Sequence, residues 1–380
     1  MKYRELGKTG LMLSEIGLGA EWLERHNRDE VKAVVESCEA HGINILDCWM
    51  SEPNVRTNLG LALAGRREKW LIQGHVGSTW NGQYVRSREM PVVKAAFQDF
   101  LDRFQTDYVD IGMIHYVDEV ADFNGIMNGP FIDYIRELKE NGTIRTVGLS
   151  THNPNVGKMA ALCGEVDMIL FSINPAFDMR PPSENIDDMF ADEYDGSLSG
   201  VAPERAELYK ICEREGVGIN VMKGYAGGRL FNAEQSPFGV ALSPVQCLHY
   251  ALTRPAVCSV LAGVETPEQV EQAVAYETAT DAEKDYSATL ASAPKHAYTG
   301  QCLYCGHCAP CPVGIDVAMV NKLYDLAVMQ EIPASTVVAH YEALSATASD
   351  CIGCQECETR CPFSVRVAER MMAARKVFSR

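Results

Sequence analysis

The chain has 380 residues, 47% of them hydrophobic and 22% charged, and carries a formal net charge of −17. A globular protein of about two domains fits this length and composition, and the acidic balance argues against nucleic acid as a partner. No run approaches about 18 apolar residues and residues 1–10 lack the apolar core of a signal peptide, so we expect neither a membrane span nor secretion.

Residues 1–280 are predicted to alternate between strands and helices. The opening residues 1–13, with a turn at residues 8–10, predict a hairpin. The apolar runs that follow predict strands at residues 14–20, 44–49, 69–76, 108–117, 143–152, 167–174, 217–224 and 257–264. Amphipathic segments predict helices at residues 28–41, 90–104, 131–141, 203–215, 243–253 and 267–276.

This series of eight strand–helix units predicts an α/β fold, a (β/α)8 TIM barrel. Runs that are apolar on both faces are typical of parallel strands covered by helices. A doubly wound sheet is the alternative, which the count of eight and the absence of a G-x-G-x-x-G motif disfavour. One long segment, residues 175–201, is a candidate lid over the barrel mouth or else a surface insertion.

Eight of the 14 cysteines form two short runs near the C-terminus, and each run is closed by a Cys-Pro pair. The second run has the C-x2-C-x2-C-x3-C-P spacing of bacterial ferredoxins. Three thiolates at this spacing wrap one corner of a cubane and the other run supplies the fourth, so we predict two interlocked [4Fe–4S] clusters. The first cluster takes Cys302, Cys305, Cys308 and Cys361, and the second takes Cys351, Cys354, Cys357 and Cys311. Two structural zinc sites are the alternative.

These runs predict the domain organisation. A barrel spans residues 1–280, a helical linker spans 281–296, and a small, mostly α-helical ferredoxin-like domain spans 297–380. Helical stretches are expected between the cysteine runs, at residues 316–331 and 334–346. Clusters and unpaired thiols fit a reducing compartment, so we expect a cytoplasmic protein.

Polar side chains stand at the carboxyl ends of successive predicted strands, where barrel enzymes carry their chemistry. Asp47, His75 and His115 end the second, third and fourth strands, and His152, Asn174 and Lys223 end the next three. A His–Asp pair suits acid–base catalysis, and imidazoles with a carboxylate also suit zinc or ferrous iron. The loop over residues 74–88 adds Trp80, Tyr84, Arg86 and Arg88, which either bind a flat or anionic ligand or are solvated.

Residues 1–280 resemble the aldo-keto reductase superfamily in several stretches. These are YRELGKTGLMLSEIGLG at the start, INILD at 43–47, TDYVDIGMIH at 106–115, IRTVGLS at 144–150 and AGVETPEQVEQAV at 262–274. The whole chain is similar to the branch that carries a C-terminal ferredoxin-like domain with two [4Fe–4S] clusters. The resemblance implies a barrel oxidoreductase.

The resemblance places a catalytic tetrad of Asp, Tyr, Lys and His in this chain, with two replacements. Asp47 matches the Asp and His115 matches the His, whereas Glu52 stands at the Tyr position and His75 replaces the Lys. We therefore expect Asp47 to orient His75, His115 to polarise a substrate oxygen, and Glu52 or His75 to supply the proton.

The resemblance also implies a nicotinamide pocket, and this chain keeps part of it. Ser150 survives, Ser172 replaces a Gln, and Gly263 marks the nucleotide segment, while Lys223 is available to hold an anionic group. Because Glu265 would repel a 2′-phosphate, NADPH is disfavoured, and NAD(H) or a flavin remains as an alternative.

The function expected from these features is the reduction or oxidation of a small carbonyl or related compound in an anaerobic setting. The two clusters would pass electrons from a ferredoxin or flavoprotein partner. A metal-dependent lyase or hydrolase with structural or sensing clusters is one alternative. An electron-transfer protein with a degenerate barrel is another.

Overall fold

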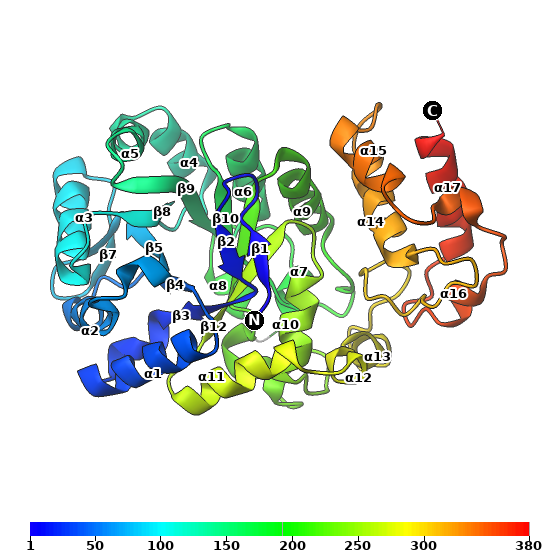
Figure 1. The fold of residues 1–380 in the computed structure, drawn as a ribbon, viewed down its shortest axis with the longest axis horizontal. Coiled ribbons are helices and arrows are strands. Elements are labelled where there is room, and N and C mark those ends of the chain that lie inside the picture. Colours follow the sequence, from blue (N-terminus) through cyan, green and yellow to red (C-terminus); the bar gives the residue numbers. More distant parts are fainter. Residues whose placement is uncertain (192, 380) are drawn as a thin grey trace.

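A closed barrel of eight parallel strands forms the larger part of the molecule (Figure 1). The computed structural model describes residues 1–191 and 193–379. The strands follow the order β10-β11-β12-β3-β4-β5-β8-β9 around the barrel. All eight predicted strands are present, and the predicted fold class is confirmed. Their bounds are β3 Ile16–Gly19, β4 Ile45–Cys48, β5 Leu71–Val76, β8 Val109–Ile114, β9 Ile144–Thr151, β10 Met168–Ser172, β11 Gly218–Met222 and β12 Val257–Gly263.

Helices surround the barrel, and the main apolar core lies between them and the strands. The six predicted helices are present as α1 Arg28–Ala40, α3 Met90–Phe104, α5 Pro130–Glu140, α9 Pro203–Glu215, α10 Pro244–Leu252 and α11 Pro267–Val274. Three more were not predicted, namely α2 Pro53–Leu63, α4 Val120–Met127 and α6 Pro154–Leu162. The structure also contains the 3-10 helices η1 Ala20–Arg25, η2 Arg67–Lys69, η3 Ala226–Phe231 and η4 Ala275–Glu277.

The N-terminal hairpin closes one end of the barrel. Strands β1 Tyr3–Glu5 and β2 Met12–Ser14 pair antiparallel, as predicted. Leu6 and Leu13 are fully buried in a cluster with the inward-facing Ile45, Ile111 and Met113. Since this hairpin covers the amino-terminal ends of the strands, ligands reach the interior from the carboxyl ends.

The carboxyl ends carry the longer connections. A second hairpin, β6 Ser78–Trp80 and β7 Tyr84–Arg86, follows β5. The candidate lid contains the short helices α7 Pro175–Asp178 and α8 Asp187–Phe190, and Ile186 from this segment lines the barrel cavity. Asp192, within the same segment, lies outside the described residues.

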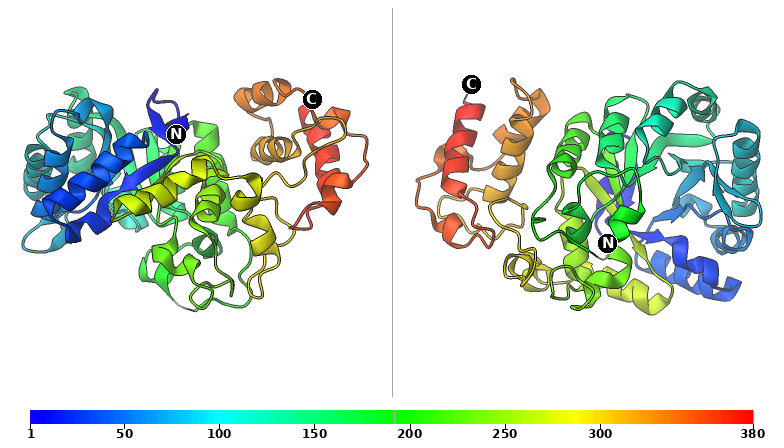
Figure 2. Two further views of the ribbon diagram at one scale, coloured as in Figure 1. Left: turned by 60° about the horizontal axis from the view of Figure 1, so that its bottom comes forward. Right: turned by 180° about the vertical axis from the view of Figure 1, so that it is seen from behind.

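The C-terminal part lies to one side of the barrel in all three ribbon views (Figures 1 and 2). Arg254 donates to the carbonyl of Leu303 at 2.5 Å and Lys322 pairs with Glu213 at 3.1 Å, so contacts to α9 and to the segment after α10 hold it there. No described helix has the length and apolarity needed to cross a membrane. The helices after the barrel are α12 Asp281–Lys284, α13 Ser287–Ala291, α14 Val317–Ala327, α15 Ser335–Glu342, η5 Ala348–Asp350, α16 Glu356–Thr359 and α17 Val367–Phe378.

Candidate active site and cluster domain

A cavity of about 880 Å³ opens at the carboxyl ends of the barrel strands. This volume is typical of cavities that bind small molecules or cofactors. Strand ends and the segments that follow them build its wall, which is the arrangement that parallel barrels use for catalysis. The strand-end residues in this wall include Gly19, Asp47, His75, His115, Ser150, His152, Met222 and Gly263.

Four of the lining side chains form one continuous hydrogen-bonded chain. The hydroxyl of Tyr84 lies 2.8 Å from Nε2 of His115, and Nδ1 of His115 lies 2.8 Å from Nδ1 of His75. Nε2 of His75 then lies 2.9 Å from Oδ1 of Asp47. We call this chain of Tyr84, His115, His75 and Asp47 the proton relay. The predicted pairing of Asp47 with His75 is therefore present in the geometry.

The direction of each hydrogen bond in the relay follows from its members. A carboxylate only accepts, so His75 donates from Nε2 to Asp47. With one proton on each ring, Nδ1 of His75 must accept, and His115 donates from its own Nδ1. Nε2 of His115 then accepts from the hydroxyl of Tyr84. All three donors point away from the cavity and towards Asp47.

Burial controls the charge state at the cavity end of the relay. His115 is 4% exposed, and burial together with the neighbouring His75 holds its pKa well below the usual range. Burial also raises the pKa of Tyr84 to about 12. Both groups are therefore neutral at physiological pH, as the hydrogen-bond directions require.

A buried amide pair supports the other end of the relay. Gln73 donates from Nε2 to Oδ1 of Asp47 at 2.7 Å, and Asn220 donates to the amide oxygen of Gln73. These three residues come from β4, β5 and β11, so three different strands position the carboxylate. Buried polar groups with this degree of hydrogen bonding hold one geometry.

Tyr84 enters the site from the β6–β7 hairpin, and several contacts hold that hairpin in place. Trp49 packs edge-on against Tyr84 with ring centroids 5.2 Å apart, and its ring stacks on His115 at 6.1 Å. Arg88 donates to the carbonyl of His115 at 2.8 Å. The hairpin is thereby attached to the segment that carries His115.

The loop position of Tyr84 did not predict this role. The sequence signal for the hairpin is the Asn81-Gly82 pair, which favours a tight turn between Ser78–Trp80 and Tyr84–Arg86. That signal predicts a hairpin but not the direction in which it folds, which depends on Trp49 and Arg88.

Two predicted site residues lie elsewhere. Glu52 does not line the cavity, because its carboxylate caps helix α2 by accepting from the amide of Val55 at 2.7 Å. The structure therefore does not bring Glu52 to the cavity in which it was expected to supply a proton, whereas Tyr84 lines that cavity. Ser172 is fully buried within β10 and also does not line the cavity.

The remaining predicted barrel residues do line the cavity. Ser150, Lys223 and Gly263 belong to its wall, and Nζ of Lys223 lies 3.4 Å from a carboxylate oxygen of Glu21. The wall continues past Gly263 to Glu265, whose carboxylate lies 3.1 Å from Nε2 of His26. This part of the cavity is a groove beyond the relay, and its wall carries both Glu265 and Arg25.

The relay does not form a site for a single metal ion. His75 and His115 each direct both ring nitrogens at a partner within the relay. Among the residues that the structure describes, no three His, Cys, Asp or Glu side chains converge as ligands of one ion would. The arrangement fits acid–base chemistry instead.

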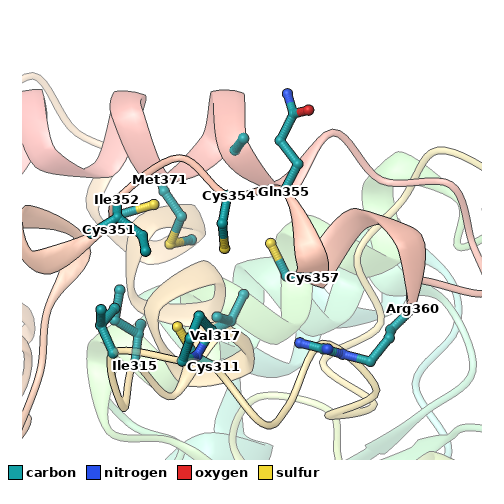
Figure 3. Close-up of a pocket in the computed structure, with 13 residues that line it drawn as sticks. Cys311, Ile315, Val317, Cys351, Ile352, Cys354, Gln355, Cys357, Arg360 and Met371 are labelled. Atoms are coloured by element: carbon teal, nitrogen blue, oxygen red, sulfur yellow. The ribbon is translucent and has the colours of Figure 1, made fainter.

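The cysteines of the second run gather with Cys311 around one small cavity (Figure 3). Cys351, Cys354 and Cys357 line it together with Cys311, and the sulfur atoms face the shared space. Four thiols are the donor set that a [4Fe–4S] cluster requires. The same four thiols would also satisfy the ligand count of a structural zinc site.

The first run lies nearer the barrel. Cys302 and Leu303 line a second cavity with Tyr209, Lys210 and Arg254 of the barrel helices. Burial raises the pKa of the Cys305 thiol, and the nearby Cys361 adds to this effect. Cys361 thus lies beside the first run, whereas Cys311 lies beside the second.

Known proteins resemble this chain in both parts. A model described as the aldo/keto reductase family matches residues 15–243, and one described as a 4Fe-4S dicluster domain matches residues 301–366. The uncharacterized oxidoreductase YqkF of Bacillus subtilis (strain 168) is 28% identical over 289 residues, covering 72% of this chain and 90% of that protein. Protein tas of Escherichia coli (strain K12) is 26% identical over 179 residues, which are 40% of this chain and 52% of that protein.

Solved structures show the same barrel. The holo form of aldo-keto reductase AKR11C1 from Bacillus halodurans superposes with a TM-score of 0.58 at 25% identity, covering 75% of this chain and 94% of that one. A putative aldo-keto reductase, PA4992 from Pseudomonas aeruginosa, superposes with a TM-score of 0.55 at 22% identity. That second match covers 72% of this chain and 93% of the other.

Proposed function

Because the chain belongs to the aldo/keto reductase family and carries a 4Fe-4S dicluster domain, we propose that it interconverts a small carbonyl compound and its alcohol. Two electrons, passed one at a time through the clusters, and one proton would be combined into a hydride on a nicotinamide or flavin bound in the cavity. The hydride would add to the carbonyl carbon, and the relay supplies the second proton to the substrate oxygen; oxidation of the alcohol reverses both transfers. The observation that supports this proposal is the unbroken hydrogen-bonded chain from Asp47 to a tyrosine hydroxyl in the cavity wall.

The relay moves a proton without a net shift of any side chain. In the reducing direction an extra proton is held on His75 beside the Asp47 carboxylate. Tyr84 passes its proton to the substrate oxygen, His115 reprotonates Tyr84, and His75 reprotonates His115. The hydrogen-bond directions found here are those of the relay after this transfer, and the reverse sequence accepts a proton from an alcohol.

The groove beyond the relay fits a nucleotide that lacks a 2′-phosphate. Gly263 and Glu265 line it, and a carboxylate there favours the ribose hydroxyls of NAD(H) over NADPH. NAD(H) or a flavin bound in the groove would supply the two-electron step, while the clusters supply single electrons. Ser150 and Lys223 line the same cavity and would contact such a group or the substrate.

The proposal assigns four cysteines to each cluster, and the position of Cys311 beside the second run supports this division. Cys302, Cys305, Cys308 and Cys361 hold the cluster nearer the barrel. Cys351, Cys354, Cys357 and Cys311 hold the outer cluster. A ferredoxin or a flavoprotein is the electron partner.

The Tyr84→Phe variant tests the proton donor. It keeps the ring that packs on Trp49 and removes only the hydroxyl, so the fold and clusters should persist. Turnover of a carbonyl panel, followed anaerobically by the oxidation of reduced methyl viologen, should fall by about 10²–10⁴. Tyr116→Phe is the matched control, because Tyr116 lines the same cavity and its hydroxyl lies outside the relay. Equal activity in Tyr84→Phe and wild type would remove the relay from the mechanism.

A further inference from the structure

The outer cluster cavity opens at the edge of the molecule, away from the barrel. Ile352, between two of its cysteines, is 66% exposed, and Cys354 is also exposed. The cavity nearer the barrel is instead lined partly by barrel residues, including Tyr209 and Arg254. Cys354 is the exposed member of the two cysteine runs, so a carrier in solution can approach the outer set directly.

Helix α17 forms the rim of this opening. Ala368 and Met371 on this helix line the cavity. Residues four apart share a helix face, so Met372 lies beside Ala368 and Arg375 lies beside Met371. Met372 is 61% exposed. Two exposed apolar side chains, Ile352 and Met372, thus flank the opening.

The same rim is basic in an otherwise acidic molecule. Residues 360–379 contain five Lys and Arg and one Glu, whereas the whole chain carries a net charge of −17. Arg360 and Arg366 pair with Glu356 and Glu369, at 3.5 and 3.1 Å.

Two further cations on the rim are unpaired. Arg375 and Lys376 are exposed on α17, and within the described residues their side chains have no hydrogen-bond or ion-pair partner. Their charges are therefore available to a partner. We call Ile352, Cys354, Met372, Arg375 and Lys376 the outer face.

We propose that the outer face is the docking surface for a small acidic protein that carries one electron. Apolar contacts at the centre and cations at the edge match such a carrier, and a cationic patch is a favoured approach on a chain whose net charge is −17. Each encounter oxidises the carrier by one electron and reduces the outer cluster by one, and no bond forms or breaks. The proposal rests on the electron path through the clusters proposed above.

Stopped-flow reduction of the full-length, cluster-loaded protein tests this docking. The probe is a reduced acidic [2Fe–2S] ferredoxin, and cluster absorbance is the readout. The wild-type rate constant should fall as ionic strength rises. The Arg375→Glu/Lys376→Glu variant should be slower by about tenfold or more at low ionic strength, with the salt dependence lost or reversed.

Two controls make the result specific. Arg28→Glu/Lys32→Glu changes the net charge equally on exposed positions of α1, which lies across the barrel from α17 (Figure 1), and should leave the rate unchanged. The radical cation of methyl viologen is a positively charged donor, so the α17 reversal should not slow it. The Met372→Gln variant, which changes no charge, should lower the rate constant for cluster reduction by ferredoxin several-fold. Its dependence on ionic strength should be that of the wild type.

Three outcomes would overturn the proposal. The first is an unchanged rate of cluster reduction by ferredoxin in the α17 variant, and the second is an equal loss of that rate in the α1 control. The third is self-association of the protein that the α17 variant abolishes, because the outer face would then bind a second copy of this chain. Cluster reduction is measured without a carbonyl substrate. Failure of docking is therefore distinct from failure of the proposed reaction.

Discussion

At the residue scale, the relay depends on the match between each donor and the next acceptor. Asp47 sets the direction, because a carboxylate cannot donate and so requires the proton on Nε2 of His75. That requirement passes through His115 to the hydroxyl of Tyr84. One carboxylate therefore decides how a tyrosine three groups away presents its proton.

Asp47→Asn tests whether Asp47 and His75 act as one unit. The amide keeps the volume but cannot stabilise an extra proton on His75, so turnover should fall by about 10²–10⁴. His75→Gln should lose a similar factor, and the double variant should lose little more, since groups that act together are far from additive. The turnover numbers of the two single variants and the double variant measure the coupling free energy between Asp47 and His75. Additive losses would show two independent roles.

His249 on α10 provides a prediction about acid stability. Burial, with Lys284 and Arg254 nearby, lowers the pKa of His249 to about 4. The unfolded chain binds a proton below about pH 6.5, whereas the folded one does so only near pH 4. The contribution of neutral His249 to the free energy of unfolding is therefore fully present above pH 6.5 and is lost as the pH falls towards 4.

The His249→Gln variant should remove this pH dependence. Between pH 7 and pH 5 the wild type should lose about 2 kcal/mol more unfolding free energy than the variant does. Urea unfolding followed by circular dichroism at the two pH values measures the difference. Parallel losses in both proteins would show that His249 is protonated in the folded state.

At the element scale, helix α2, which follows the strand that carries Asp47, packs closely against helix α3. A Cβ placed on Gly60 of α2 would lie 2.1 Å from the backbone oxygen of Arg103 on α3. Glycine is required there for packing. The same helix α2 begins at Pro53 and uses Glu52 as its cap, which is why that carboxylate is not in the cavity.

Gly60→Ala and Gly125→Ala form a matched pair for this element. Gly60→Ala should destabilise the barrel by about 1–3 kcal/mol, because the added methyl meets backbone that cannot yield easily. Gly125, on exposed α4, has nothing within 4 Å of an added Cβ, so Gly125→Ala should stabilise by about 0.5–1 kcal/mol. The thermal unfolding temperatures of the two variants and of the wild type measure both effects. A neutral Gly60→Ala would mean that α2 and α3 move apart freely.

At the scale of the whole molecule, the cysteine domain has one cysteine set facing the barrel and one facing outwards. The barrel borders the cavity of Cys302 and Leu303 through α9 and the segment after α10, and α17 borders the cavity of the outer set. The two proposed clusters would thereby be ordered in space between solution and the barrel. This order supports a path from an external carrier inwards.

Cys361→Ser tests the crossed ligation at this scale. It should damage the cluster of the first run and leave the outer cluster intact, while Cys311→Ser should do the reverse. Iron analysis and electron paramagnetic resonance of anaerobically purified protein distinguish the two clusters. Cys163→Ser, at an exposed single cysteine, is the control. Loss confined to the outer cluster in Cys361→Ser would refute the crossed assignment.

Sequence pattern alone determined the barrel, its eight strands and the division of the cysteines into two runs. These follow from local periodicity and spacing, which do not depend on distant residues. Asp47, His75 and His115 were also predictable, since barrel strands bring their carboxyl ends together. The tertiary structure alone decided which side chain we propose as the proton donor. Glu52 stood at the expected position but became a helix cap, and Tyr84 reached His115 because Trp49 and Arg88 fold the hairpin inwards. A loop's direction depends on contacts between segments far apart in the chain, and no local pattern encodes them.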